Sequence, residues 1–148
     1  MTFFEEFIQE VGKHLQVSLQ IEKETLCRIL LPKGLSVQFE YVREKNHILI
    51  AAFLGELPPG RFREEMLKEA LKSNSLADSI GVFSYLPESN QLILTMTLYQ
   101  AFEIKPLESF TQFAEKSALW KEAISGGQIA LIAQNSPQKT KISPMAFK

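Results

Sequence analysis

The spacing of hydrophobic residues changes after residue 16, and this change most restricts the folds open to the chain. In residues 3–15 apolar side chains recur every three or four positions, the period of one helical face, with polar side chains between them. From residue 17 to residue 54 apolar positions alternate with polar ones or form short unbroken runs, which is typical of strands. A helix followed by several strands predicts the α+β class.

Turn signals and helix-end signals divide the remaining chain into elements. Thr2 and Glu5 have the spacing of a capping box for the first helix. Pro106 near a helix start and Gly127 past its end have the asymmetry that helices prefer. The expected elements are helices at 3–15, 61–74 and 105–125, a meander of strands at 26–31, 35–41 and 47–54, and a hairpin of strands at 82–86 and 92–99. The order predicts a twisted antiparallel sheet flanked by three helices.

The length of 148 residues, with 45% hydrophobic and 22% charged residues, fits one domain that can bury a core without disulfides. We expect that domain to span residues 1–127. Residues 128–148 form a C-terminal extension with one short apolar patch, followed by a segment rich in Ser, Pro, Gln, Thr and Lys. Such a composition buries little apolar surface, so the last dozen residues are expected to be flexible.

The charge balance and the ends of the chain limit its partners. A formal net charge of -1 gives no overall attraction to nucleic acid or to anionic lipid. No run of eighteen apolar residues occurs, and the first residues carry Glu5 and Glu6 where a signal peptide would carry basic side chains. We therefore expect a cytoplasmic protein that neither binds nucleic acid nor inserts into a membrane.

Residues for catalysis or metal binding are scarce. The chain has two histidines, one cysteine and a single aspartate, Asp78, and it lacks the common nucleotide-binding, hydrolase and metal-binding motifs. Cys27 lies in an apolar run, which favours a buried residue over a nucleophile. A pair of Cys27 and His47 is the remaining way to build an enzyme. We expect no enzymatic activity, no cofactor and no metal.

Two features point to binding instead. Phe3, Phe4 and Phe7 cover a wider arc of the first helix than one packing seam needs, so either part of this face is exposed or all three rings pack on the sheet. The edge strands of the sheet have unpaired backbone groups that could accept an extended peptide. A binding module therefore fits the sequence better than an enzyme does.

Several segments, taken in their order and spacing, resemble the class I type III secretion chaperones of the Tir-chaperone family. They cover most of the chain from the first helix to the third, and the extension after residue 127 matches no family motif. The segments are Leu26-Cys27-Arg28-Ile29-Leu30-Leu31, the run from His47 to Pro58, the run from Met66 to Asn74, and Gly81-Val82-Phe83-Ser84-Tyr85 followed by Pro87 to Leu94.

The resemblance implies an α-β-β-β-α-β-β-α fold and a non-catalytic bacterial homodimer. Such a dimer binds the N-terminal region of secreted effectors in an extended state and keeps them soluble and secretion-competent. The secretion ATPase is a further candidate partner. The alternative is a non-catalytic adaptor or regulator of the type III secretion apparatus.

Candidate site residues follow from the same resemblance. For the dimer interface they are Phe62, Met66, Leu67, Ala70, Leu71, Val82 and Phe83. For effector binding they are Phe4, Phe7, Ile8, Val11, Ile29, Val37 and Phe39. The family is often markedly acidic, whereas this chain has a pI of about 6.2, so its charge gives no further guide to the site.

Overall fold

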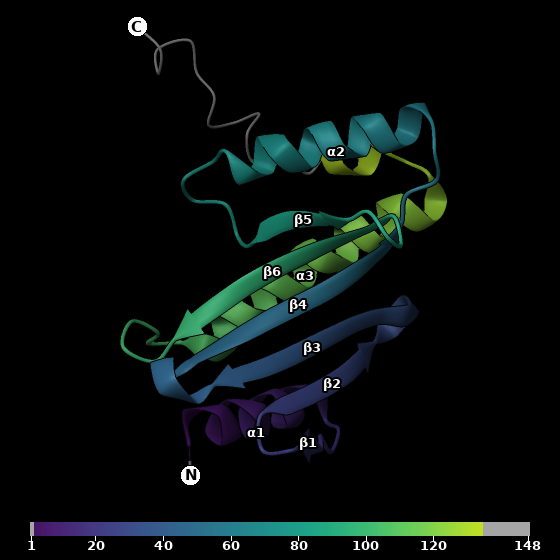
Figure 1. Ribbon diagram of the computed structural model, residues 1–148. Coiled ribbons are helices and arrows are strands. Elements are labelled where there is room, and N and C mark those ends of the chain that lie inside the picture. Colours follow the sequence, from purple (N-terminus) through teal and green to yellow (C-terminus); the bar gives the residue numbers. More distant parts are fainter. Residues whose placement is uncertain (1, 135–148) are drawn as a thin grey trace, which may run out of the picture.

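The computed structural model describes residues 2–134, which form one sheet with helices packed against it (Figure 1). In chain order the elements are α1 (Phe3–Leu15), β1 (Ile21–Glu22), β2 (Leu26–Leu31), the 3-10 turn η1 (Pro32–Gly34), β3 (Leu35–Val42), the 3-10 turn η2 (Arg43–Lys45), β4 (His47–Glu56), α2 (Arg61–Asn74), β5 (Val82–Leu86), β6 (Gln91–Tyr99), α3 (Pro106–Gly126) and α4 (Ala130–Gln134).

The sheet has six antiparallel strands in the order β1-β2-β3-β4-β6-β5. Figure 1 shows α1 behind β2 and β3, and α3 behind β4 and β6. Helix α2 lies beside β5, and α4 packs on α3. The covered face carries the residues that alternate inward along each strand, while Leu30, Leu49 and Val82 point to the other face and are exposed.

Aromatic rings join α1 to the sheet and to α3. The ring of Phe7 lies edge-on to those of Phe39 in β3 and Phe110 in α3, with centroids 5.6 and 6.1 Å apart. Phe4 stacks on Tyr41 at 5.5 Å. Such pairs stabilise a core by about 0.5–1.5 kcal/mol each beyond the area they bury. The face of α1 that could have been exposed therefore packs inward at Phe4 and Phe7, and Phe3 is partly buried.

Helix ends follow the signals in the sequence. The Thr2 hydroxyl accepts a hydrogen bond from the Glu5 backbone N–H at 3.1 Å, and the Glu5 carboxylate accepts one from the Thr2 N–H at 3.1 Å. These capping hydrogen bonds lower the pKa of Glu5. At the other end of the chain, Gly127 adopts a left-handed conformation with φ of 63° and ends α3. Both predicted caps are confirmed.

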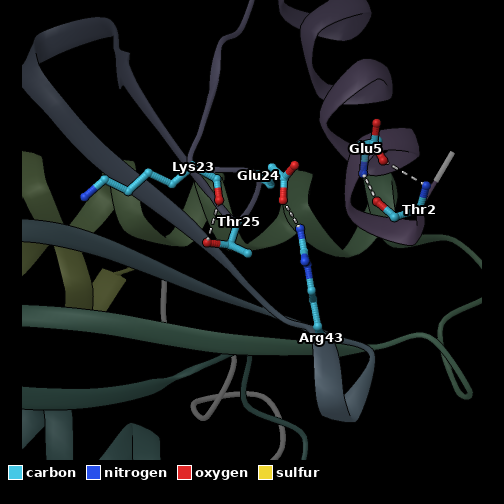
Figure 2. A network of polar contacts seen from close by, with 6 residues as sticks. All are labelled: Thr2, Glu5, Lys23, Glu24, Thr25 and Arg43. Atoms are coloured by element: carbon cyan, nitrogen blue, oxygen red, sulfur yellow. Dashed lines mark hydrogen bonds and ion pairs between the residues drawn. The ribbon is translucent and has the colours of Figure 1, made fainter.

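Polar contacts tie two turns together at one end of the sheet (Figure 2). Lys23 and Glu24, in the turn that joins β1 to β2, both have positive φ, and the Thr25 hydroxyl donates to the Lys23 carbonyl at 3.5 Å. Arg43 of η2 donates to the Glu24 carboxylate at 2.6 Å. Because both side chains of this ion pair are more than half exposed, it contributes little to stability, and its effect is to hold the β1–β2 turn against the β3–β4 turn.

The predicted fold is confirmed, with two short additions. Strand β1 has only two residues, and α4 lies beyond the predicted domain boundary at residue 127. Ile132 of α4 is 5% exposed and belongs to the core, so the packed part of the chain includes this helix. The expected flexibility of the last dozen residues concerns positions outside the described part of the chain.

Candidate protein-binding surfaces

The residues proposed for effector binding lie in the core rather than on an open surface. All seven are at most 8% exposed: Phe4, Phe7, Ile8, Val11, Ile29, Val37 and Phe39. Their side chains fill the space between α1, the sheet and α3. Only Ile8 also borders the groove along α1, and contact of the others with cargo stays a prediction.

That groove lies between α1 and the extended segment that follows it. It has a volume of about 620 Å³ and is open to solvent. Its walls are Glu5, Ile8, Gln9, Gly12, Lys13 and Gln16 on the helix side, and Val17, Ser18, Leu19 and Ile21 on the segment side. Val17 is 51% exposed, so an apolar wall is available to a ligand.

Gly12 of α1 and Gln16, the residue that caps this helix, account for the course of the segment. Gln16 adopts a left-handed conformation with φ of 58°, which ends the helix and turns the chain back along it. The Val17 backbone N–H then donates to the Gly12 carbonyl at 3.0 Å. A Cβ atom on Gly12 would lie 3.0 Å from the Val17 carbonyl oxygen, so a glycine at this position permits the close approach. The sequence analysis did not predict that residues 17–21 form one wall of a groove. The signal that could have indicated it is Gly12, a glycine within a helical pattern.

The two edges of the sheet differ in their access. Strand β1 pairs only with Leu26 and Cys27, so within residues 2–134 the stretch of β2 from Arg28 to Leu31 has a strand partner on one side only. At the opposite edge, Asn74 of α2 hydrogen-bonds both backbone groups of Phe83 in β5, at 2.8 and 3.0 Å. The edge of β2 from Arg28 to Leu31 can therefore accept a further strand, whereas the edge of β5 is covered at Phe83.

The predicted dimer residues divide into a buried set and an exposed set. Met66, Ala70 and Phe83 are at most 5% exposed and hold α2 and β5 in the core, while Phe62 and Leu67 are partly buried. Leu71 is 69% exposed and Val82 is 55% exposed. The exposed pair lies on the neighbouring elements α2 and β5, where a partner could cover both side chains.

A half-buried lysine fixes the connection between α2 and β5. The Lys116 ammonium of α3 donates to the hydroxyls of Ser73 and Ser79 at 2.8 and 2.9 Å, and to the Ile80 carbonyl at 2.8 Å. It also lies 5.0 Å from the centroid of the Phe83 ring. Burial lowers the pKa of Lys116 to about 8. Nothing in the sequence identified this contact, because it joins residues far apart in the chain.

The residues considered for catalysis do not meet. Cys27 lies on the covered face of the sheet with 0% exposure, and burial raises the pKa of its thiol to about 11. His47 points to the opposite face of the sheet, because the buried positions of β4 begin at Ile48. Its ring lies edge-on to that of Tyr99, with centroids 5.3 Å apart. Among the described residues no group of three or more His, Cys, Asp or Glu side chains could hold a metal ion, and no helix is long and apolar enough to cross a membrane.

The sequence profile of the Tir chaperone protein (CesT) family matches residues 6–118, which is most of the chain. The chain belongs to this family. The expected resemblance is thereby confirmed, and with it the predicted class of function, a type III secretion chaperone. Among curated proteins no sequence matches the chain.

Solved structures of low sequence identity share the fold of this CesT-family chain. The HopA1-SchA chaperone-effector complex contains a chain with a TM-score of 0.63 and 14% identity, covering 82% of this chain and 94% of its own. A chain of the ExsC-ExsE complex has a TM-score of 0.61 and 13% identity, with coverages of 84% and 97%. The Yersinia pestis type III secretion chaperone SycH, in complex with a fragment of YscM2, matches with a TM-score of 0.59 and 14% identity, with coverages of 76% and 95%.

Proposed function

We propose that this chain binds the N-terminal region of secreted effector proteins in an extended state, and that the groove along α1 is the main contact. The observation that carries the proposal is that groove, about 620 Å³ in volume, on a chain of the CesT family. The relatives support it, because HopA1-SchA is a chaperone-effector complex and SycH is a secretion chaperone in complex with a fragment of YscM2.

The chemistry of the groove suits a cargo of variable sequence. The apolar walls at Val17, Leu19 and Ile21 hold apolar side chains at about 25 cal/mol per Å² removed from water. The open edge of β2 offers backbone hydrogen bonds, which do not depend on the side chains of the cargo. We assign Ile8 to direct contact with cargo. The other six predicted residues act from beneath, by holding α1 and the sheet in place.

We further propose that two copies associate through α2 and β5. Leu71 of α2 and Val82 of β5 give each copy two exposed apolar side chains on neighbouring elements. A two-fold axis would bring the same patch of both copies together and offer one cargo chain two identical grooves. The dimer acts by binding, without chemical turnover. It works in the bacterial cytoplasm, where the secretion ATPase is a candidate to receive the cargo.

The test uses an effector found by mass spectrometry among the proteins that co-purify with the chain from a type III secreting bacterium, made as its N-terminal fragment. Val17→Asp places a charge on the exposed groove wall and should weaken binding at least about tenfold. Leu49→Asp is the matched control, because Leu49 is an exposed apolar residue of β4 outside the groove. Equal binding by both variants and the unchanged chain would overturn the proposal.

A further inference from the structure

The segment that joins β6 to α3 exposes large apolar side chains. Phe102 is 80% exposed and Ile104 is 91% exposed, and Tyr99 at the end of β6 is 46% exposed. The rings of Tyr99 and Phe102 meet edge-on with centroids 6.2 Å apart. Figure 1 shows this segment projecting at the end of the sheet, between β6 and the start of α3. Several such side chains in one short segment are typical of an interaction site rather than of scattered surface residues.

Hydrogen bonds hold the segment in its conformation. The backbone N–H groups of Phe102 and Glu103 donate to the Tyr99 carbonyl at 3.0 and 2.9 Å, and the Gln100 N–H donates to the Asn46 carbonyl at 3.2 Å. The Ser109 hydroxyl of α3 donates to the Glu103 carboxylate at 3.2 Å. A surface that is already ordered loses less conformational entropy when a partner binds.

Two hollows adjoin the segment and meet at Gln100. One, of about 460 Å³, is lined by Lys45, Asn46, Tyr99, Gln100, Ala101 and Phe102. The other, of about 240 Å³, is lined by Phe3, Glu6, Phe7, Glu10, Gln100, Glu103 and Pro106. The second hollow has three carboxylates and no basic side chain in its lining. None of these carboxylates takes part in the ion pairs found among the described residues.

We propose that residues 99–104 and the acidic hollow beside them form a second protein-binding surface. Its partner is a protein segment in which lysine or arginine side chains are interleaved with aromatic or aliphatic ones. The apolar side chains of the partner cover Phe102 and Ile104, and its cations lie against Glu6, Glu10 and Glu103. Charge complementarity of this kind selects the partner and sets the orientation in which it docks.

This surface is separate from the proposed cargo groove. The groove uses Glu5, Gln9 and Lys13 of α1, whereas the acidic hollow uses Glu6 and Glu10 on another flank of the helix. The two linings share no residue. Cargo and the second partner can therefore be bound at the same time, as a chaperone that delivers its cargo to another protein requires.

The first experiment uses two synthetic peptides with the same pattern of leucine and phenylalanine, one with lysine and one with glutamate at the polar positions. Amide shifts of the full-length protein, labelled with ¹⁵N, report the site of binding. The lysine peptide should shift residues 99–104 with Glu6 and Glu10, and added salt should weaken its binding. Equal binding of the glutamate peptide, or shifts at Val17, Leu19 and Ile21 without shifts at residues 99–104, would overturn the proposal.

The second experiment uses Phe102→Ser with Ile104→Ser, two exposed positions where the change leaves the core intact. Affinity for the lysine peptide should fall at least about tenfold, while Leu49→Ser, which changes an exposed residue of β4 outside both proposed surfaces, should have no effect. Binding of the effector fragment should be unchanged. Loss of effector binding would show that the segment belongs to the cargo site. A fall in the mass of the protein from dimer to monomer would show that the segment binds a second copy of the chain. Either result rejects this proposal, and the cargo groove is tested separately by Val17→Asp.

Discussion

Asn74 forms with Phe83 the two hydrogen bonds that a neighbouring strand would otherwise form. Its side-chain oxygen accepts from the Phe83 N–H at 2.8 Å, and its side-chain nitrogen donates to the Phe83 carbonyl at 3.0 Å. The last residue of α2 thereby closes the edge of β5 at this point and sets the distance between helix and strand. Within residues 2–134, β2 keeps an edge without a strand partner from Arg28 to Leu31, whereas β5 is covered by α2 at Phe83.

Replacing Asn74 by alanine should destabilise the chain by about 1–2 kcal/mol, because both backbone groups of the buried residue Phe83 lose a hydrogen-bond partner. Urea unfolding measures the change, and hydrogen exchange at the Phe83 amide should become faster. Asn74→Asp is a second variant: its carboxylate can still accept from the Phe83 N–H, but its other oxygen faces the Phe83 carbonyl, so this variant should also lose stability. An alanine variant as stable as the unchanged chain would show that the two bonds do not fix this edge.

The dimer patch leads to a second prediction. Leu71→Glu with Val82→Glu should convert a dimer into a folded monomer, because both side chains are more than half exposed within one copy and their charges would be buried between two. Light scattering gives the mass, and circular dichroism shows that the fold remains. Leu30→Glu is the control, since Leu30 is 75% exposed on β2, away from α2 and β5. One chain has a mass of 16.8 kDa, and a double variant that still has twice this mass would exclude this interface.

A third prediction concerns Cys27. Its side chain is fully buried and its pKa is raised to about 11, so a thiol reagent at pH 8 should modify it only as fast as the chain opens. Cys27→Ala should lower the free energy of unfolding by about 1 kcal/mol through lost packing and leave binding of the effector fragment unchanged. Rapid labelling of the native chain, or loss of binding with stability retained, would mean that the thiol faces an accessible site.

The elements were predictable from the sequence because their signals are local. The capping box of Thr2 and Glu5 and the glycine after α3 lie within a few residues of the ends that they mark. Strand β1 and helix α4 were not identified as elements, since two and five residues are too few to display a hydrophobic period. These short elements depend on the structure around them: β1 pairs with β2, and α4 packs on α3.

The candidate surfaces were less predictable, because exposure depends on which elements meet. Apolar spacing cannot distinguish Phe4, which is buried against Tyr41, from Leu71, which is open to solvent. The groove requires the chain to turn at Gln16 and to approach Gly12, and the Lys116 contact joins α3 to the end of α2. Such relationships between distant residues follow from the whole fold and leave no pattern in a short window of sequence.

The last prediction concerns pH and the half-buried Lys116. Burial lowers its pKa from the ordinary value of 10.5 to about 8, and it has three neutral oxygen acceptors within hydrogen-bond distance. Between these two pH values the unfolded chain holds a proton that the folded chain has released. Unfolding then takes up a proton, so the contribution of Lys116 to the free energy of unfolding rises with pH across this window and is constant below it.

Lys116→Met should remove this pH dependence. Relative to the methionine variant, the unchanged chain should gain stability as the pH rises from 8 towards 10.5, and the difference between the two should not vary between pH 6 and pH 7, roughly one unit or more below the folded pKa. Urea unfolding of both proteins across the pH range provides the measurement, with Lys68→Met as the control for an exposed lysine of α2. Parallel stability curves for the unchanged chain and Lys116→Met above pH 8 would show that Lys116 keeps its proton in the fold, and that its contacts with Ser73, Ser79 and Ile80 compensate for its burial.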